Sequence, residues 1–148
     1  MLTYFLIFFV IVLALAPLTH FLPSKQQRRI ARLREYAAVH GMFVEFRDLP
    51  GKTLIPRPDG EVIYYGKRLP ASRPGPLTTA AWVRTPDSWR SVGERTPAPE
   101  AVQGLPPEIL AASVDLSSCG VYWTEAGEVE AVEKIRQSLE QWCTALMT

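Results

Sequence analysis

The sequence predicts an α+β protein with a single N-terminal transmembrane helix, a basic juxtamembrane helix, and a small, mostly antiparallel sheet with a C-terminal amphipathic helix packed on it. Three observations predict this arrangement: a charge-free apolar run at the start, a basic run directly after it, and a C-terminal stripe of apolar residues at helical spacing. The 148 residues leave room for one domain of roughly 100 residues beyond the two N-terminal helices.

Residues 1–22 are expected to form a membrane anchor. From Leu2 to Ala16 the chain has no charged residue, and about 20 apolar residues cross a bilayer core of about 30 Å as a helix. Pro17 is tolerated near the end of such a helix. No basic residue precedes the run, and Pro17 would follow the cut after Ala14-Leu15-Ala16, so an anchor is favoured over a cleaved signal peptide.

The charge pattern predicts an orientation. Residues 24–40 contain five basic residues against one acid, whereas residues 98–148 contain two against eight. By the positive-inside rule we expect a single-pass protein of the plasma (inner) membrane, with its N-terminus outside and its C-terminal domain in the cytoplasm. Two cysteines without a disulfide framework fit a reducing compartment.

Residues 23–41 predict the basic juxtamembrane helix. Ser24 is expected to cap it and Gly41 to end it. Its apolar residues share one face, and the opposite face gathers the four basic residues proposed to face the membrane lipid: Lys25, Arg28, Arg29 and Arg32. This face either contacts lipid headgroups or a membrane partner, or is a solvated topology signal.

Residues 42–148 predict the cytoplasmic α+β domain. Alternation favours a strand over 42–47, a short strand over 53–55, a hairpin turn at Asp59-Gly60 and a strand over 61–65 that ends at Gly66. Residues 70–108 hold eight of the thirteen prolines and predict a proline-rich loop. Within it we expect a strand over 80–84 and a mobile surface loop over 91–104.

The remaining elements follow the same patterns. Residues 105–112 are expected to form a short helical turn, and 113–116 and 120–124 a strand pair across Ser117-Ser118. The last helix is expected to begin near Gly127. Its apolar stripe comprises Val132, Ile135, Leu139, Trp142 and Leu146, with Cys143 at the edge.

No catalytic, cofactor-binding or metal-binding residues are predicted. The two cysteines and two histidines lack the spacing of a zinc site, and the phosphate-loop, Gly-x-Ser-x-Gly, His-Glu-x-x-His and Gly-x-Gly-x-x-Gly motifs are absent from the sequence. Cys143 is expected in the core. Cys119 follows two serines in a predicted turn, so it could be exposed and reactive, although no base or cation is predicted nearby to activate it.

A possible partner surface lies in the proline-rich middle of the chain, at Trp82, Trp89, Tyr64 and Arg84. Aromatic residues and arginines are enriched at interface hot spots, but the same residues could be core or interfacial packing. Nucleic acid is not an expected partner, because the domain is net acidic and its basic residues are scattered.

The apolar span followed by Pro23, Gln26, Gln27, Arg28 and Arg29 resembles the YajC-type auxiliary subunits of the bacterial preprotein translocase. The resemblance covers only this part of the chain, and the Lys-Gly-Asp run and Gly-Gly turn of that family are missing here. It implies an auxiliary subunit of a protein-export complex.

More generally, we expect a non-enzymatic module that binds or assembles with another membrane protein. The alternative is a membrane-tethered enzyme or small-ligand binder, with Cys119 or a pocket under the last helix as its site. Oligomeric state, partner identity and strand order are not predictable from these patterns.

Overall fold

The structure, a computed structural model, describes residues 1–20, 24–71 and 79–147, without the side chains of residues 18–20. It divides into two compact units, Met1–Ile30 and Ala31–Thr148, which are described separately below. Parts of the predicted span (21–22) and of the proline-rich loop (72–78) lie outside the described residues.

The first unit contains α1 (Leu2–His20) and the beginning of α2 (Lys25–Val39). The side chains of α1 up to Pro17 are exposed, and the helix contains no charged residue. Within the described part of the chain, no helix is both long enough and apolar enough to cross a membrane. The predicted transmembrane helix is therefore not supported by the structure, although the segment is helical as expected.

The cap predicted at the start of α2 is confirmed. The backbone N–H of Gln27 donates to Ser24 Oγ (3.2 Å), and the backbone N–H of Ser24 donates to Gln27 Oε1 (3.0 Å). This reciprocal pair is a capping box, which satisfies two amide groups at the helix start. The predicted end is confirmed as well, because Gly41 adopts φ 79° just after the helix.

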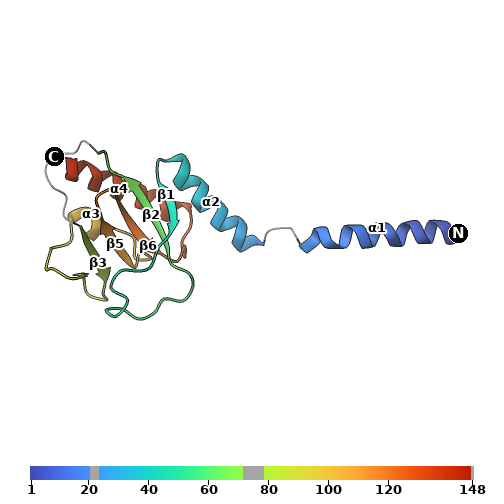
Figure 1. Cartoon of the computed structure of the whole chain (residues 1–148), viewed down its shortest axis with the longest axis horizontal. Helices are drawn as coiled ribbons and strands as arrows, with labels where there is room; N and C mark the ends of the chain where they lie inside the picture. Colours follow the sequence, from blue (N-terminus) through green and yellow to red (C-terminus); the bar gives the residue numbers. More distant parts are fainter. Residues whose placement is uncertain (21–23, 72–78, 148) are drawn as a thin grey trace. The chain divides into compact units, whose positions relative to one another are not determined.

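The second unit is built on one six-stranded sheet in the order β1-β2-β6-β5-β3-β4. All neighbouring strands are antiparallel, so the predicted α+β class and antiparallel sheet are confirmed (Figure 1). The strands are β1 (Phe43–Phe46), β2 (Ile63–Arg68), β3 (Ala80–Arg84), β4 (Trp89–Ser91), β5 (Ala111–Val114) and β6 (Ser118–Trp123).

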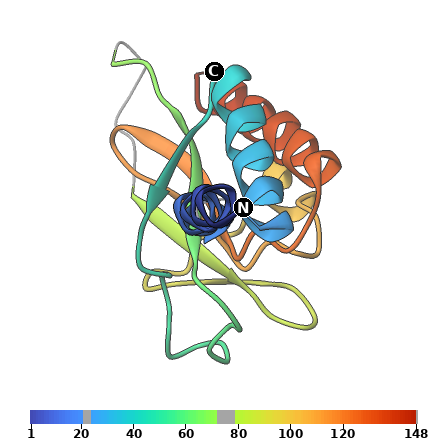
Figure 2. The same ribbon diagram turned by 90° about the vertical axis from the view of Figure 1, so that its right-hand side faces the viewer.

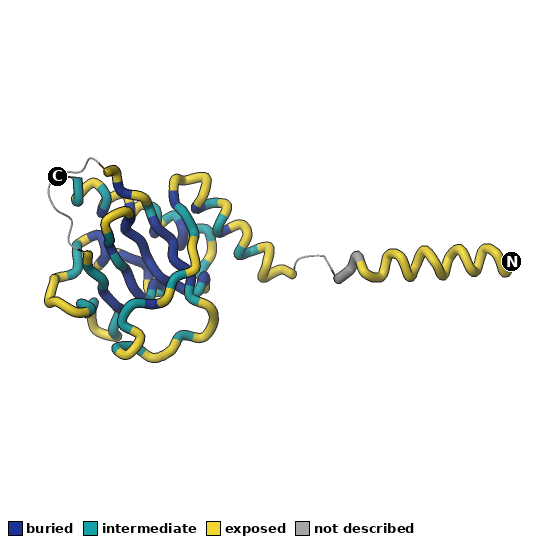
Figure 3. Tube along the Cα trace, viewed as in Figure 1, coloured by how far each residue is buried: buried dark blue, intermediate teal, exposed yellow. Residues whose placement is uncertain are grey.

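The main core lies between one face of the sheet and three helices. The second half of α2, the short α3 (Glu100–Gln103) and α4 (Val129–Met147) cover this face, and Figure 2 shows α2 and α4 side by side. The predicted stripe of α4 is confirmed: Val132, Ile135, Leu139 and Trp142 are buried, while Leu146 packs at the margin. Figure 3 shows the buried strands between exposed connections.

The other face of the sheet is covered by the β1–β2 connection, residues 47–62. Leu49, Leu54 and Ile55 of this connection join a second core with Tyr64 and Tyr122. A Cβ at Gly51 would lie 2.9 Å from Val92 Cγ2, so the connection reaches across the face to the residue that follows β4. The sheet is thus buried on both sides, one by helices and one by a loop.

The structure corrects three local predictions around this connection. Residues 53–55 form a turn rather than a strand, because the Leu54 N–H bonds to Gly51 O (2.9 Å) and Leu54 packs onto the sheet. Asp59-Gly60 lies in a long connection instead of a tight hairpin. Gly66 lies inside β2 instead of ending it, since Tyr64 rests on it: a Cβ at Gly66 would lie 2.5 Å from the Tyr64 ring.

Two further predictions fail between β4 and β5. Residues 100–103 of the predicted surface loop form α3, and Ala101 and Val102 are buried. The helical turn predicted for 105–112 is a non-helical turn followed by β5. The Arg84 guanidinium stabilises this turn, because it donates to the carbonyls of Leu105, Pro106 and Ile109 at 2.9–3.0 Å.

Candidate functional site

A buried ion pair fixes α2 to the domain. Glu125, only 2% exposed, lies in the connection between β6 and α4 and accepts two bonds from Arg34: Nη2–Oε1 at 2.8 Å and Nε–Oε2 at 3.0 Å. The hydroxyl of Tyr65 also donates to Glu125 Oε2 at 2.6 Å. A bidentate arginine–carboxylate pair is among the strongest polar contacts in proteins, so this cluster orients α2 as well as holding it.

Burial and hydrogen bonding shift the pKa values of two residues in this cluster. Burial and the bond to Glu125 raise the pKa of Tyr65 well above its usual range, and the bond to Glu125 raises the pKa of Arg34. Both groups therefore keep their protons at physiological pH. A second contact, from the Tyr36 hydroxyl to Glu133, joins α2 to α4 directly, and Leu33 and Ala37 supply the apolar part of the contact.

The four residues predicted to face lipid all belong to the first part of α2. Lys25, Arg28 and Arg32 are exposed and Arg29 is half-buried, with its Nε donating to Gln26 Oε1 (3.2 Å). The structure therefore leaves a basic surface on α2 away from the side that Leu33 and Ala37 bury. Whether this surface meets lipid stays a prediction.

The predicted partner surface is divided by the sheet. Tyr64 is buried under the β1–β2 connection, and Trp82 is buried on the helix face. Arg84 and Trp89 do come together, because the Arg84 guanidinium carbon lies 4.6 Å from the centre of the Trp89 ring. Of the four residues, only Arg84 and Trp89 are partly exposed at one site.

A hollow of about 450 Å³ opens beside Trp89. One wall is the β3–β4 turn and strand β4, and the other wall is the segment around residues 95–97. Its described lining consists of Thr85, Ser88, Trp89, Arg90, Ser91, Arg95, Thr96 and Pro97. Two arginines and several hydroxyl-bearing residues thus belong to a lining whose described part has no acidic residue.

Internal bonds hold both walls in place. Thr85 Oγ1 donates to Ser88 O (2.7 Å) and accepts from the Ser88 N–H (3.1 Å), which closes the β3–β4 turn. The indole N–H of Trp82 donates to Thr96 O (2.9 Å) and ties the opposite wall to the sheet. These bonds connect both walls of the hollow to the sheet.

A second hollow, of about 700 Å³, is enclosed by the β1–β2 connection. Its basic residues include Arg47, Lys52 and Arg57, and its acids are Asp48 and Glu61. Lys52 lies 3.5 Å from Asp48, and Arg47 pairs with Glu45 and Asp115. Most of its charge is thus already compensated by neighbours.

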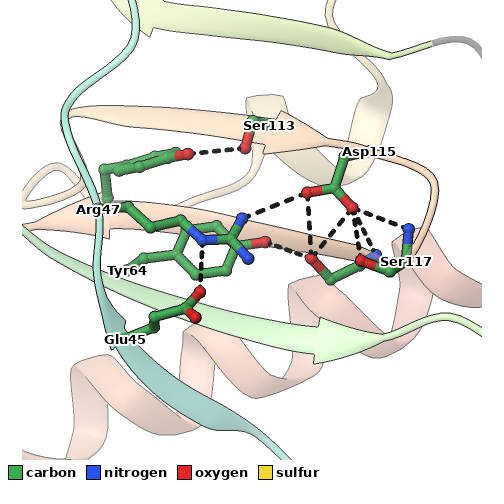
Figure 4. A network of polar contacts seen from close by, with 8 residues as sticks. Glu45, Arg47, Tyr64, Ser113, Asp115 and Ser117 are labelled. Carbon is green, nitrogen blue, oxygen red and sulfur yellow. Dashed lines mark hydrogen bonds and ion pairs between the residues drawn. The ribbon is translucent and has the colours of Figure 1, made fainter.

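Arg47 also takes part in the polar network that Figure 4 shows on the loop side of the sheet. Its guanidinium carbon lies 4.0 Å from the Tyr64 ring centre, and Tyr64 shares a hydrogen bond with Ser118 (3.0 Å). Asp115 accepts the backbone N–H groups of Ser117 (2.8 Å) and Ser118 (2.9 Å). These contacts close the β5–β6 turn, so the network has a structural role.

The two cysteines lie in different surroundings. Cys119 is fully buried in the helix-side core, which corrects the expectation that it could be exposed. Its side chain points to this face because strand alternation puts Ser118 on the loop side. Burial raises the pKa of the Cys119 thiol to about 12, and Cys143 lies at the edge of the core as predicted. Among the described residues, no group of three or more metal-binding side chains comes together.

Sequence reasoning missed Glu125 as the centre of a cluster. Arg34 and Glu125 are 91 positions apart, and no local pattern connects them. Glu125 stands between Thr124 and Ala126, at the point where the strand pattern changes to the helical one, and no feature of that pattern distinguishes it from a surface glutamate. It adopts φ 57°, a conformation that costs a non-glycine residue about 1–2 kcal/mol.

Comparisons of the chain with protein-family models, curated proteins and solved structures find no match. The resemblance to translocase auxiliary subunits stays a prediction.

Proposed function

We propose that the chain is a membrane-anchored interaction module that faces the cytoplasm and docks another membrane protein or complex. Under this proposal α1 is the anchoring segment, α2 is the connecting helix and the sheet domain is the docking part. The proposal makes no use of catalysis.

One observation carries the proposal: a helix without charge and with exposed apolar side chains precedes a helix whose second half packs on a folded domain. In water, exposing so many large apolar side chains is costly, at roughly 1.5–3 kcal/mol for each that could be buried. A bilayer or a partner removes that cost. The nineteen residues of α1 extend about 28 Å at 1.5 Å per residue, slightly less than the thickness of about 30 Å of a hydrocarbon core.

The basic surface of α2 supports the same arrangement. Each basic residue near an anionic leaflet gains roughly 1 kcal/mol, so Lys25, Arg28 and Arg32 favour the cytoplasmic side. The ion pair between Arg34 and Glu125 then relates the orientation of the domain to that of α2. A passive tether would need no such bond.

Affinity purification of the full chain from gently solubilised membranes tests the docking part of the proposal. We expect a defined membrane protein to copurify in constant ratio, and to be lost when the domain carries a core-disrupting change such as Trp123→Asp. Recovery of the chain alone at every expression level would contradict docking. A reporter fused after Thr148 tests orientation, with activity expected only on the cytoplasmic side.

A membrane-tethered small-ligand binder is the second candidate. The hollow within the β1–β2 connection is large enough for a small molecule, since ligand pockets span roughly 300–1,000 Å³. Because most of the charged residues in this hollow are already paired, ligand binding is supported less strongly than docking. Substitution of Arg57 by Glu would abolish binding of an anionic ligand there without affecting copurification of a protein partner.

A further inference from the structure

We propose that the hollow beside β4 binds an extended acidic segment of a protein partner. This inference rests on the proposed docking function and names the chemistry of the partner. The hollow measures about 450 Å³ and lies between β4 and the segment around residues 95–97.

Charge is the first argument. The side chains of Arg90 and Arg95 make no ion pair or hydrogen bond with any described residue, and both residues are exposed in the lining. In the hollow of the β1–β2 connection, by contrast, Arg47 and Lys52 are already paired. Guanidinium groups bind carboxylates through two parallel bonds, so an acidic partner would supply the charges that this lining lacks.

The edge of the sheet is the second argument. β4 is the last strand in the sheet order. Along its pairing with β3, residue pairs that exchange backbone hydrogen bonds alternate with pairs that do not. Thr85 N bonds to Ser88 O, and Val92 N bonds to Ala81 O. The pair halfway between these two, Val83 and Arg90, is therefore also hydrogen-bonded. The backbone groups of Trp89 and Ser91 therefore point away from β3, toward the outer edge.

Such an edge accepts an added strand. An extended peptide that pairs with an exposed sheet edge gains affinity from backbone hydrogen bonds and specificity from pockets for alternate side chains. Here the edge residues Trp89 and Ser91 also line the hollow. Acidic side chains of the added strand would reach Arg90 and Arg95.

Preorganisation is the third argument. The Thr85–Ser88 turn and the Trp82–Thr96 bond fix the two walls. Arg84 lies over the Trp89 ring, 4.6 Å from its centre, and is itself held by three carbonyls. Since the walls are ordered before binding, little conformational entropy is lost when a ligand enters.

These observations favour a peptide over an anionic lipid headgroup. A headgroup would pair with the guanidinium groups but would leave the N–H and C=O groups of Trp89 and Ser91 without strand-like partners. An acidic extended segment satisfies both features. We therefore assign the hollow to a protein segment.

The test uses the full chain in mild detergent micelles and a fluorescent hexapeptide of alternating glutamate and valine. We expect saturable binding that weakens at least tenfold in the double variant R90Q/R95Q, because two charge-assisted contacts are lost. The control is K134Q, which removes an exposed positive charge of α4 outside both hollows and should leave binding unchanged. A circular dichroism spectrum and unfolding midpoint equal to those of the native chain establish that each variant folds.

Two further probes separate the sources of negative charge. The same hexapeptide with methylated backbone nitrogens keeps its carboxylates but cannot pair as a strand, and we expect it to bind at least tenfold more weakly. Vesicles containing phosphatidylglycerol and free inorganic phosphate should not discriminate between the native chain and R90Q/R95Q.

Several results would overturn the proposal. These are absence of peptide binding, equal weakening by K134Q, equal binding of the methylated peptide, or an R90Q/R95Q effect confined to vesicles or phosphate. Failure of the docking function is separable, because copurification of membrane proteins is measured independently. A chain that binds the hexapeptide but copurifies with no protein would contradict docking and leave the acidic-peptide site standing.

Discussion

Arg34 of α2 and Glu125 of the β6–α4 connection form a two-bond ion pair at 2.8 and 3.0 Å, with Glu125 almost fully buried. The same carboxylate accepts the Tyr65 hydroxyl from β2. One residue therefore connects the basic helix, the sheet and the start of the last helix. Its φ of 57° indicates that the surrounding contacts hold it in an unfavourable backbone conformation.

Glu125→Ala should lower the free energy of unfolding by about 2–3 kcal/mol, because it leaves the Arg34 guanidinium and the buried Tyr65 hydroxyl without the carboxylate to which they donate. Partial solvent access to Arg34 keeps the loss below that of a fully buried pair. Urea unfolding of the full chain in mild detergent, followed by tryptophan fluorescence, measures it. Glu35→Ala on the exposed side of α2 is the control, with an expected change within about 0.5 kcal/mol. Equal effects of the two changes would contradict a central role for Glu125.

Gly120→Ala should destabilise the domain by about 1–3 kcal/mol through overpacking. A Cβ at Gly120 would lie 2.4 Å from Cζ of Tyr64, a distance that forces the ring to move. Combining it with Tyr64→Ala should cost less than the sum of the two single changes, since the clash disappears with the ring. Gly104→Ala is the control, because its nearest contact would be 3.8 Å. Strict additivity in the double-mutant cycle would refute this reading of the glycine.

These two sites show what the sequence could and could not predict. Periodicity located α2, α4, β1 and β3, because each depends on local alternation and on nearby caps such as Ser24 and Gly41. Gly66 was misread as a strand end, because its role is set by a ring that lies across two strands. Arg84 was predicted either in a partner surface or in packing, and in the structure it binds carbonyls 21–25 positions away, contacts that no local pattern predicts.

The candidate sites divide in the same way. Arg84 and Trp89 were predicted together and lie together, since they face each other across a tight β3–β4 pair. Tyr64 and Trp82 were predicted with them, but both are buried, Tyr64 on the loop side of the sheet and Trp82 on the helix side. Which element covers each face depends on strand order, which the sequence does not predict. The Arg34–Glu125 pair depends on that same long-range arrangement and left no local pattern to find.

Stability should fall on acidification through Asp115. Burial alone would raise the pKa of Asp115, but bonds from the Ser117 and Ser118 N–H groups and from Arg47 hold it below its ordinary value of 3.8. A carboxylate with a depressed pKa in the folded state stabilises the protein above that ordinary value, and the contribution is lost as the pH falls through the folded-state pKa. Asp115→Asn should therefore destabilise the chain at pH 7, and the difference should shrink toward pH 3.

Urea unfolding at several pH values between 7 and 3 measures this dependence. Asp87→Asn, at an exposed position in the β3–β4 turn, is the control. Its free energy of unfolding should change with pH in the same way as that of the native chain. A deficit for Asp115→Asn that stays constant across this range would show that titration of Asp115 does not contribute.

Thiol labelling should distinguish the two cysteines. Because burial raises the pKa of Cys119 to about 12, almost none of it is thiolate at pH 8, and reagent has no access to it. Cys143 is partly exposed and should react much faster in the native chain. Mass spectrometry of peptides after timed labelling measures both rates, and urea should make them similar. Rapid native labelling of Cys119 would contradict its place in the core.

Alkaline extraction of membranes tests the anchoring role of α1 most directly. The full chain should remain in the membrane pellet after a carbonate wash, while Val10→Arg should shift a substantial part to the supernatant, because a charge at the centre of a membrane helix costs about 2.5–3.5 kcal/mol. Val39→Arg, an equal charge change at an exposed position of α2, should stay in the pellet. Release of the native chain into the supernatant would contradict the membrane-anchored account.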